Sequence, residues 1–192
     1  MKNIFTDIYK NKKWKDNYGT DSGPGSSIEC SKPYLDFLQE FCMSNNIKSI
    51  LDLGCGDFNL MMHFNFNKIE YVGIDIVDYI IVKNQQLYGI SNIKFKCESI
   101  TEYKMDNHYD LIILKDVFQH LSINNIKKIL GNINKNKHVI ITNDYSDNNN
   151  NNDINDGGYS SIDLLKFPYN KMGQFVFEWQ SCFFLKKSFK LL

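Results

Sequence analysis

The stretch Ile50-Leu51-Asp52-Leu53-Gly54-Cys55-Gly56-Asp57 decides the fold of this chain. Its first half is apolar, which is typical of a buried strand, and its second half is a glycine-rich turn. Glycine permits a sharp turn and a close approach of a ligand to the backbone. In an alternating α/β sheet, ligands bind beyond the carboxyl ends of the strands. The stretch therefore predicts a ligand-binding loop after the first strand of such a sheet.

A carboxylate follows at the spacing expected for ribose recognition. The segment Tyr71-Val72-Gly73-Ile74-Asp75 reads as a second buried strand that ends in an acid. A carboxylate placed about twenty residues after the glycine turn can accept hydrogen bonds from both hydroxyls of a ribose. A dinucleotide-binding fingerprint would need a third glycine at Asn59, so the loop does not match an NAD site.

The pattern resembles motif I of the class I S-adenosylmethionine (SAM)-dependent methyltransferases, with Phe58 where many members carry a third glycine. The stretch from Cys55 to Asn59 is similar to that of a small subgroup of predicted methyltransferases in this superfamily. That subgroup also carries an upstream tryptophan and an S-G-x-G-S loop, matched here by Trp14 and Ser22 to Ser26. Its D-x-x-x-H-L-S stretch is matched by Asp116 to Ser122.

The resemblance extends roughly over residues 14–168 and implies SAM as the cofactor and S-adenosylhomocysteine as its product. It implies one domain over residues 1–192, with a Rossmann-like α/β fold whose mostly parallel sheet is closed by an antiparallel C-terminal hairpin. It also implies that Glu98 faces the adenine amino group, with Ser99 and Ile100 beside the ring. The cofactor-binding residues that we expect are Asp52, Gly54, Cys55, Gly56, Asp75, Ile76, Glu98, Ser99 and Lys115.

The hydrophobic periodicity predicts the remaining elements. Strands are expected over 47–53, 70–76, 93–97, 109–114 and 138–142, and a hairpin over 174–179 and 182–186. Helices are expected over 31–45, with Ser31 as N-cap and Pro33 in the first turn, and over 77–88 and 116–130. Shorter helices are expected over 58–64 and 160–166. Residues 1–27 read as a loop that could cover the site, and the Asn-rich segment 147–156 as a mobile loop.

Composition restricts the class of function. The chain has 192 residues, a formal net charge of 0 and no arginine, which argues against a nucleic-acid partner. No apolar run has the length of a membrane span, and Met1 to Lys15 lacks the apolar core of a signal peptide, so a cytoplasmic protein is expected. The five cysteines are scattered and form no C-x-x-C pair. We therefore expect reduced thiols rather than a disulfide or a zinc site.

Asp116 and His120 are the candidate catalytic residues. They follow the fourth predicted strand, and on a helix positions i and i+4 share one face. Methyl transfer to an alcohol requires removal of the hydroxyl proton, and histidine has a suitable pKa for that step. The alternative is that Asp116 is a helix N-cap and His120 a structural residue. Lys115 is a candidate clamp for an anionic substrate, and Asn143, Asp144 and Tyr145 are candidates to line the acceptor pocket.

The expected activity is O-methylation of a small polar acceptor, such as the sugar hydroxyl of a nucleotide-sugar or a glycan. One alternative is an RNA or protein methyltransferase, because Lys32 and Asp116 fall near the first two positions of a Lys-Asp-Lys-Glu set. No lysine ends the fifth strand to complete that set. Another alternative is a non-catalytic SAM-binding protein. No metal site is predicted, because spacing alone does not bring Asp116, His120 and Asp144 together.

Overall fold

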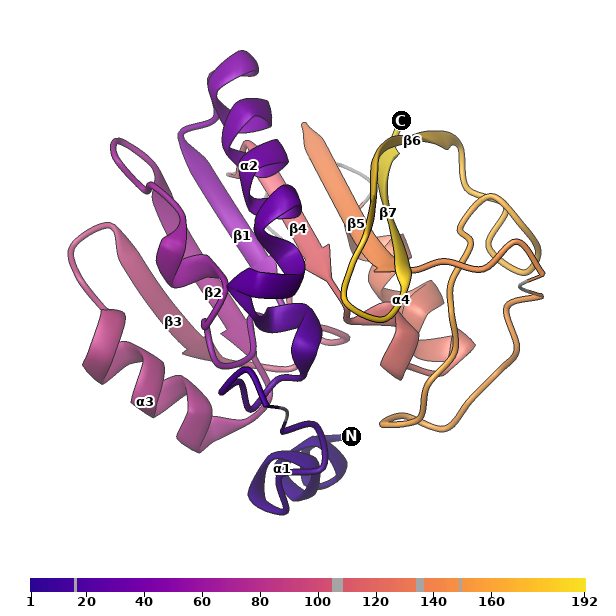
Figure 1. The fold of residues 1–192 in the computed structure, drawn as a ribbon, viewed down its shortest axis with the longest axis horizontal. Helices are drawn as coiled ribbons and strands as arrows, with labels where there is room; N and C mark the ends of the chain where they lie inside the picture. Colours follow the sequence, from indigo (N-terminus) through magenta and orange to yellow (C-terminus); the bar gives the residue numbers. More distant parts are fainter. Residues whose placement is uncertain (16, 105–108, 134–136, 149) are drawn as a thin grey trace.

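The computed structural model describes residues 1–15, 17–104, 109–133, 137–148 and 150–192. All seven described strands form one sheet in the order β3-β2-β1-β4-β5-β7-β6 (Figure 1). The five parallel strands are β1 (Ser49–Leu53), β2 (Glu70–Asp75), β3 (Ile93–Cys97), β4 (Leu111–Lys115) and β5 (His138–Asp144). The antiparallel strands are β6 (Gly173–Gln180) and β7 (Leu185–Leu191). The predicted fold class is therefore confirmed.

Helices cover both faces of the sheet because successive strand residues point to opposite sides. On one face, Ile50 and Leu111 share a core with Leu38 of α2 (Ile28–Ser44). On the other face, Leu51 shares a core with Ile126 of α4 (Ile123–Ile133). The third helix of this layer structure, α3 (Asp78–Tyr88), follows β2 and contacts β3. A parallel sheet covered on both faces explains why these strands are almost purely apolar.

The N-terminal segment differs from the predicted loop. Residues Lys2–Lys10 form helix α1, which lies beneath the carboxyl ends of β1 and β2 in Figure 1. Phe5, Ile8 and Tyr9 lie on the helix face that packs inward. The i, i+3, i+4 spacing of these apolar residues was a signal for an amphipathic helix that the composition of the segment obscured.

Helix α2 begins earlier than predicted. Its N-cap is Ser27, whose Oγ accepts a hydrogen bond from the Cys30 backbone N–H at 3.2 Å. Ser31 is buried inside the helix and donates to the Gly25 carbonyl at 2.7 Å. Pro33 consequently lies in the second turn and not in the first. The predicted cap was wrong because Ser27 and Ser31 are one turn apart and both could serve as a cap.

Several other local predictions need correction. The segment predicted to be helical over 58–64 contains only the 3₁₀ turn η2 (Met61–His63), and residues 160–166 are not helical. The segment predicted as a helix over 116–130 divides into a 3₁₀ turn, η3 (Phe118–His120), and α4. The second hairpin strand begins at Leu185 and not at Cys182. Each difference arises where short apolar runs fit more than one element.

Hydrogen bonds join the described residues of the Asn-rich loop to the rest of the domain. Asp153 Oδ1 accepts from the Ile123 N–H at 2.8 Å, and Asp156 Oδ1 accepts from the Ser122 N–H at 2.9 Å. Two acids thus satisfy free donors at the N-terminus of α4, where negative charge is also favoured by the helix dipole. Asn151 is buried and its amide donates to the carbonyls of Asp163 and Phe167. The contacts give the loop a structural role that its low-complexity composition did not indicate.

Candidate active site

The glycine turn after β1 lies at the carboxyl edge of the sheet. It is beside the topological switch point, where the strand order reverses between β1 and β4. Gly54 and Gly56 have φ values of 85° and 55°, which favour glycine. A Cβ on Gly54 would lie 2.5 Å from Val117 Cγ2, and one on Gly56 would lie 2.5 Å from Ser22 Oγ. Both glycines are therefore required by backbone conformation and by close packing.

Phe58 occupies the position where the resembling motif often has a third glycine. Its φ of 62° lies in the left-handed region that glycine favours, yet its ring is buried. The ring packs against Phe66, Tyr71 and Phe95, with centroid distances of 6.0, 5.3 and 4.9 Å. The turn therefore keeps the glycine-like backbone, and burial of an aromatic ring offsets its strain.

Asp75 ends β2 with its carboxylate against the glycine turn. Oδ2 accepts from the Gly56 N–H at 3.1 Å, and Oδ1 accepts from the Val77 N–H at 3.0 Å. Burial raises the pKa of the Asp75 carboxyl, and the backbone donors oppose that shift. A carboxylate has about four acceptor positions, so the backbone donors leave it capacity to accept from a ribose hydroxyl.

Asp52 precedes the turn and is also buried. Its Oδ2 accepts from the Tyr71 hydroxyl at 2.7 Å. Burial raises the pKa of Asp52 to about 7, although the hydrogen bond from Tyr71 acts in the opposite direction. The site therefore contains a carboxyl group that can be neutral or charged near physiological pH.

One chamber, which we call the inner chamber, lies over this turn. Its lining includes seven of the nine predicted cofactor residues, both candidate catalytic residues and side chains of the N-terminal segment. Among the lining residues are Tyr9, Trp14, Ser22, Asp52, Gly54, Cys55, Gly56, Asp57, Asp75, Ile76, Ile100, Lys115, Asp116 and His120. The predicted Glu98 and Ser99 are not among its lining residues. Glu98 is exposed beyond the end of β3, where its N–H donates to the Asp75 carbonyl at 3.0 Å.

The N-terminal segment forms a wall of the inner chamber. Ser22 Oγ lies 2.7 Å from the Tyr9 hydroxyl and accepts from the Asp57 N–H at 2.9 Å. In return, Asp57 Oδ2 accepts from the Asp21 N–H at 2.8 Å. Helix α1 and the S-G-x-G-S loop are thus fastened to the glycine turn by side-chain hydrogen bonds. Sequence reasoning missed Tyr9 and did not foresee that Asp57 of the glycine turn binds the N-terminal segment, because both roles depend on contacts across more than ten residues.

Asp116 lies at the centre of a buried charge network and not on a helix with His120. It follows β4 with a φ of 59°, and η3 begins two residues later. Lys115 Nζ donates to Asp116 Oδ2 at 2.6 Å, and Lys186 Nζ of β7 donates to Asp116 Oδ1 at 2.6 Å. These ammonium groups lower the pKa of the Asp116 carboxyl despite its burial. The predicted shared helix face is therefore wrong, although both residues line the same chamber.

Lys115 holds the S-G-x-G-S loop in addition to Asp116. Its Nζ donates to the Gly25 carbonyl at 2.5 Å and lies 5.6 Å from the centre of the Tyr34 ring. Burial lowers the pKa of Lys115, and Asp116 opposes that shift. In the structure its ammonium thus fastens a wall of the site, whereas the sequence suggested a substrate clamp.

His120 has a defined tautomer. Its Nδ1 lies 2.8 Å from the Gly158 carbonyl oxygen. Because a carbonyl can only accept, Nδ1 carries the proton and Nε2 of the neutral ring is the basic nitrogen. Burial lowers the pKa of His120, which favours the neutral ring. The ring packs against Trp14 with a centroid distance of 4.6 Å.

A second chamber, the outer chamber, adjoins the inner one. The two share Trp14, Ser22, Asp116 and His120 as lining residues. The other walls of the outer chamber come from the Gly157-Gly158-Tyr159 turn, from β5 and from the hairpin. The predicted Asp144 is part of this lining, whereas Asn143 and Tyr145 are not. His120 therefore stands where the two chambers meet.

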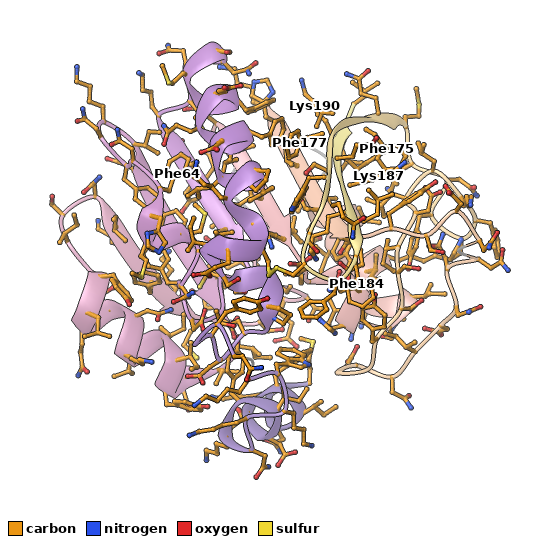
Figure 2. The ribbon with its side chains drawn as sticks, in the orientation of Figure 1. Phe64, Phe175, Phe177, Phe184, Lys187 and Lys190 are labelled. Carbon is orange, nitrogen blue, oxygen red and sulfur yellow. A yellow bond between two sulfur atoms is a disulfide. The ribbon has the colours of Figure 1, made fainter. Side chains whose placement is uncertain are left out.

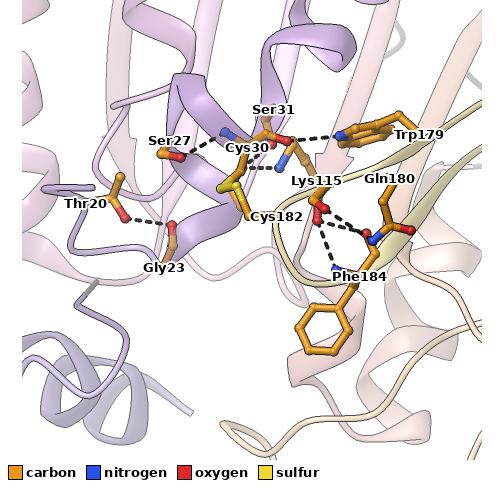
Figure 3. Close-up of a disulfide and its surroundings, with 12 residues drawn as sticks. Thr20, Gly23, Ser27, Cys30, Ser31, Lys115, Trp179, Gln180, Cys182 and Phe184 are labelled. Atoms are coloured by element: carbon orange, nitrogen blue, oxygen red, sulfur yellow. Dashed lines mark hydrogen bonds between the residues drawn. A yellow bond between two sulfur atoms is a disulfide. The ribbon is translucent and has the colours of Figure 1, made fainter. Parts of the chain in front are cut away.

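A disulfide joins two walls of the outer chamber. Cys30 in the first turn of α2 is bonded to Cys182 in the β6–β7 turn, with the Cα atoms 5.1 Å apart (Figure 3). The adjacent Trp179 Nε1 donates to the Cys30 carbonyl at 3.1 Å. The prediction of reduced thiols is thus wrong for these two cysteines, whereas Cys42, Cys55 and Cys97 are free. Sequence could not reveal the pair because 152 residues separate its members.

Within the ranges that the structure describes, no group of three or more His, Cys, Asp or Glu side chains is arranged to hold a metal ion. No helix in those ranges has both the length and the apolar character needed to cross a membrane.

The fold and the inner chamber define a class I SAM-dependent methyltransferase, with the sheet order and antiparallel C-terminal strands of that class. The family model described as "Methyltransferase domain" matches residues 44–166, and the chain belongs to this family. The matched region runs from the end of α2, through the glycine turn and β5, to residue 166.

Curated relatives match a part of the chain. The malonyl-[acyl-carrier protein] O-methyltransferase of Bacillus cereus is 31% identical over 101 residues, which cover 52% of this chain and 37% of that protein. The enzyme of the same name from Anoxybacillus flavithermus is 35% identical over 77 residues, or 39% of this chain and 30% of that protein. The chain thus matches about a third of the length of each of these two relatives.

Solved structures share the fold over nearly the whole chain. Magnesium protoporphyrin IX methyltransferase from Synechocystis, with bound SAM, has a TM-score of 0.66 at 13% identity and covers 98% of this chain and 95% of its own. The 1,6-didemethyltoxoflavin-N1-methyltransferase of Burkholderia thailandensis has a TM-score of 0.69 at 13% identity, and the match covers 99% of this chain and 86% of that protein. At these identities the likeness establishes the fold alone.

Proposed function

We propose that this methyltransferase acts on a hydroxyl group of a small polar acceptor, such as a sugar hydroxyl, held in the outer chamber. The observation that carries the proposal is the position and tautomer of His120. The ring lines both chambers, and its Nδ1–H is engaged by Gly158, so Nε2 is left as a base. A hydroxyl acceptor is the substrate class that needs such a base.

The inner chamber fits SAM. Asp75 retains acceptor capacity for a ribose hydroxyl, while Ile76 and Ile100 supply apolar surface for the adenine ring. The Gly54 to Gly56 turn admits the cofactor close to the backbone. We assign Asp52, Cys55 and Lys115 to the same chamber, and we assign Glu98 and Ser99 a peripheral position. When bound, SAM supplies a methyl group already activated on a sulfonium.

The chain's own residues then have three tasks. The walls of the two chambers hold the acceptor hydroxyl in line with the methyl group, which is the main requirement of a displacement reaction. His120 Nε2 accepts the hydroxyl proton, and the lowered pKa of the ring keeps it able to do so. The N-terminal segment 1–27, which we propose as a lid, excludes water through its contacts with Asp57 and Lys115.

The relatives support oxygen as the methylated atom, because the curated proteins that match are named O-methyltransferases. The structure gives less support to an RNA acceptor. Lys32, the candidate first member of a Lys-Asp-Lys-Glu set, is exposed and donates to Asp36 at 2.6 Å. Lys186, which approaches Asp116 instead, is buried and paired.

The cytoplasmic location expected from the sequence stays a proposal. The Cys30–Cys182 disulfide argues against it, because disulfides persist mainly in oxidising compartments.

The experiment that tests the proposal measures methyl transfer from isotopically labelled SAM. Purified protein is incubated with hydroxyl acceptors, including free sugars, nucleotide-sugars and phenols, and with short RNA as the comparison. We expect a labelled methyl ether from a hydroxyl acceptor, and loss of that product in His120→Gln. Transfer to RNA alone, or an unchanged rate in His120→Gln, would contradict the proposal. Binding of SAM without transfer to any acceptor would favour a non-catalytic SAM-binding protein.

A further inference from the structure

One wall of the outer chamber is a row of rings. The ring centroids of Trp14 and His120 are 4.6 Å apart, those of His120 and Tyr159 6.1 Å, and those of Tyr159 and Phe184 5.7 Å. Figure 2 shows Phe184 at the turn end of the hairpin, which places this end of the row beside the chamber. Tyr159 and Phe184 are 48% and 46% exposed, so part of each side chain is accessible to a ligand.

Another part of the lining, adjacent to the rings, is made of charged groups that pair with one another. Lys186 Nζ donates to Asp116 Oδ1 at 2.6 Å and to Asp144 Oδ1 at 2.5 Å. Asp116 Oδ2 is engaged by Lys115, and Asp144 Oδ2 accepts from the Tyr159 hydroxyl at 2.9 Å. Lys186 is 3% exposed, so its charge is compensated by protein groups and not by water.

The balance of charge determines which acceptors this wall tolerates. Aromatic faces beside carboxylates form a typical site for an organic cation. Here Lys186 already lies between the two carboxylates, and with Lys115 it makes the local sum of charges zero. A ligand ammonium would have to lose its water beside the ammonium of Lys186, without a free carboxylate to pair with.

We propose that Lys186 is a specificity-determining residue that occupies the cation position of the outer chamber, so that the acceptor is an uncharged, hydroxyl-bearing ring and not an amine. The inference rests on the proposed function, because it assigns the outer chamber to the acceptor. The ring stacks on Tyr159 and Phe184, and its hydroxyl approaches His120. An aryl ring and a sugar ring share this chemistry, since each offers an apolar face to the aromatic side chains, the aryl ring a flat one and the sugar ring one of C–H bonds, with hydroxyl groups at the edge.

Matched pairs of probes test the inference by binding alone. The first pair is 4-propylcatechol and dopamine, which differ only by a methyl against an ammonium group, and the second is methyl glucoside and methyl glucosaminide at a pH where the amines are charged. Binding is measured by ligand-observed NMR and calorimetry in the presence of saturating S-adenosylhomocysteine. We expect the wild-type protein to bind the neutral member of one pair at least tenfold more tightly than the ammonium member. The pair that binds distinguishes an aryl from a sugar acceptor.

The variant Lys186→Met tests whether Lys186 is responsible for the preference for neutral probes. Removal of the ammonium frees Asp144 and Asp116 for a ligand cation, so the preference for the neutral probe should fall at least tenfold or reverse. Lys187→Met is the matched control, because Lys187 pairs with Glu178 at 3.2 Å and lies over Tyr145 instead of lining the chamber. Lys186→Gln serves as a second variant if Lys186→Met does not fold.

The outcomes separate this inference from the proposed function. Failure of the wild-type protein to bind S-adenosylhomocysteine would remove the proposed function together with this inference. If the cofactor product binds, the inference alone is overturned by equal binding of neutral and ammonium probes, or by binding of neither neutral ring. An unchanged preference in whichever Lys186 variant folds would likewise overturn the role of Lys186.

Discussion

The imidazole Nδ1 of His120 lies 2.8 Å from the carbonyl oxygen of Gly158. This single contact fixes the proton on one ring nitrogen and leaves the other basic. Gly158 belongs to the segment that follows the Asn-rich loop, and the neighbouring Gly157 N–H donates to the His120 carbonyl at 2.8 Å. The candidate base and the C-terminal part of the chain therefore hold one another in position.

Replacement of His120 by Gln should remove the base and leave the assigned ribose contacts of the inner chamber in place. We expect turnover to fall about 10²- to 10⁴-fold, the range typical of a lost general base. The affinity for SAM should remain within about twofold of the wild-type value, because the assigned ribose contacts lie on Asp75. Steady-state kinetics and calorimetry measure the two quantities. A variant with full activity would show that His120 is structural.

The pH dependence of turnover should follow the His120 ring. A base acts in its neutral form, and burial lowers the pKa of His120 from its usual 6.5. With the cofactor site saturated, the contribution of His120 to the rate should therefore be constant through neutral pH and fall as the pH decreases through that lowered pKa. A rate that instead rises on acidification would exclude this role. The His120→Gln variant should lack this limb of the profile.

Asp75 should contribute to cofactor affinity through its carboxylate. In Asp75→Asn the charge and one strong acceptor are lost, and we expect the Kd for SAM to rise roughly tenfold or more. Asp78→Asn is the matched control, because Asp78 is exposed three residues away and pairs with Lys2 at 3.3 Å. An equal effect in both variants would mean that charge alone, and not the ribose contact, is responsible.

The sheet could be predicted from the sequence because its strands are buried on both faces. Strand β3 matches its predicted range; β1, β2 and β5 differ from theirs by one or two residues at one end, and β4 differs at both ends. The ligand loop was equally clear, since glycine at positive φ and a terminal carboxylate are local features. Local patterns of this kind pointed to the glycine turn, and seven of the nine predicted cofactor residues line the inner chamber.

Features made by distant contacts could not be predicted. Lys186 comes from β7 and reaches Asp116 across 70 residues, and nothing in the sequence around it marks it as buried. The Cys30–Cys182 bond joins positions 152 residues apart. Asp153 and Asp156 lie in a low-complexity stretch, yet they cap a helix that precedes them in the chain. In each case the tertiary fold provides the partner, and the local sequence carries no signal of it.

Gly25 should be intolerant of a side chain. A Cβ at this position would lie 2.3 Å from Asp116 Oδ2, so the charge network or the S-G-x-G-S loop would have to move. We expect Gly25→Ala to lower turnover by about tenfold or more, because small displacements at a reaction site have large effects. Gly131→Ala, with nothing within 4 Å of its Cβ, should retain activity and gain up to about 1 kcal/mol of helix stability. Equal activity in the two variants would contradict the role of this close approach.

The disulfide should stabilise the fold and the outer chamber. We expect Cys182→Ser to lower the free energy of unfolding by about 2–4 kcal/mol, as measured by urea denaturation under oxidising conditions. A reductant should bring the wild-type protein to a similar stability and leave the variant unchanged. Cys97→Ser is the control, because that thiol is free and exposed. A stability of Cys182→Ser equal to that of the wild type would show that the bond does not form in solution.

Calorimetric titration of the purified chain with SAM, and separately with NADH, tests the central claim most directly. The glycine turn, Asp75 and the apolar surface of Ile76 and Ile100 together predict saturable, one-to-one binding of SAM. NADH should not bind, because Asn59 stands where its fingerprint requires a glycine. Absence of SAM binding, or binding of NADH in its place, would contradict the assignment of the inner chamber and with it the proposed reaction.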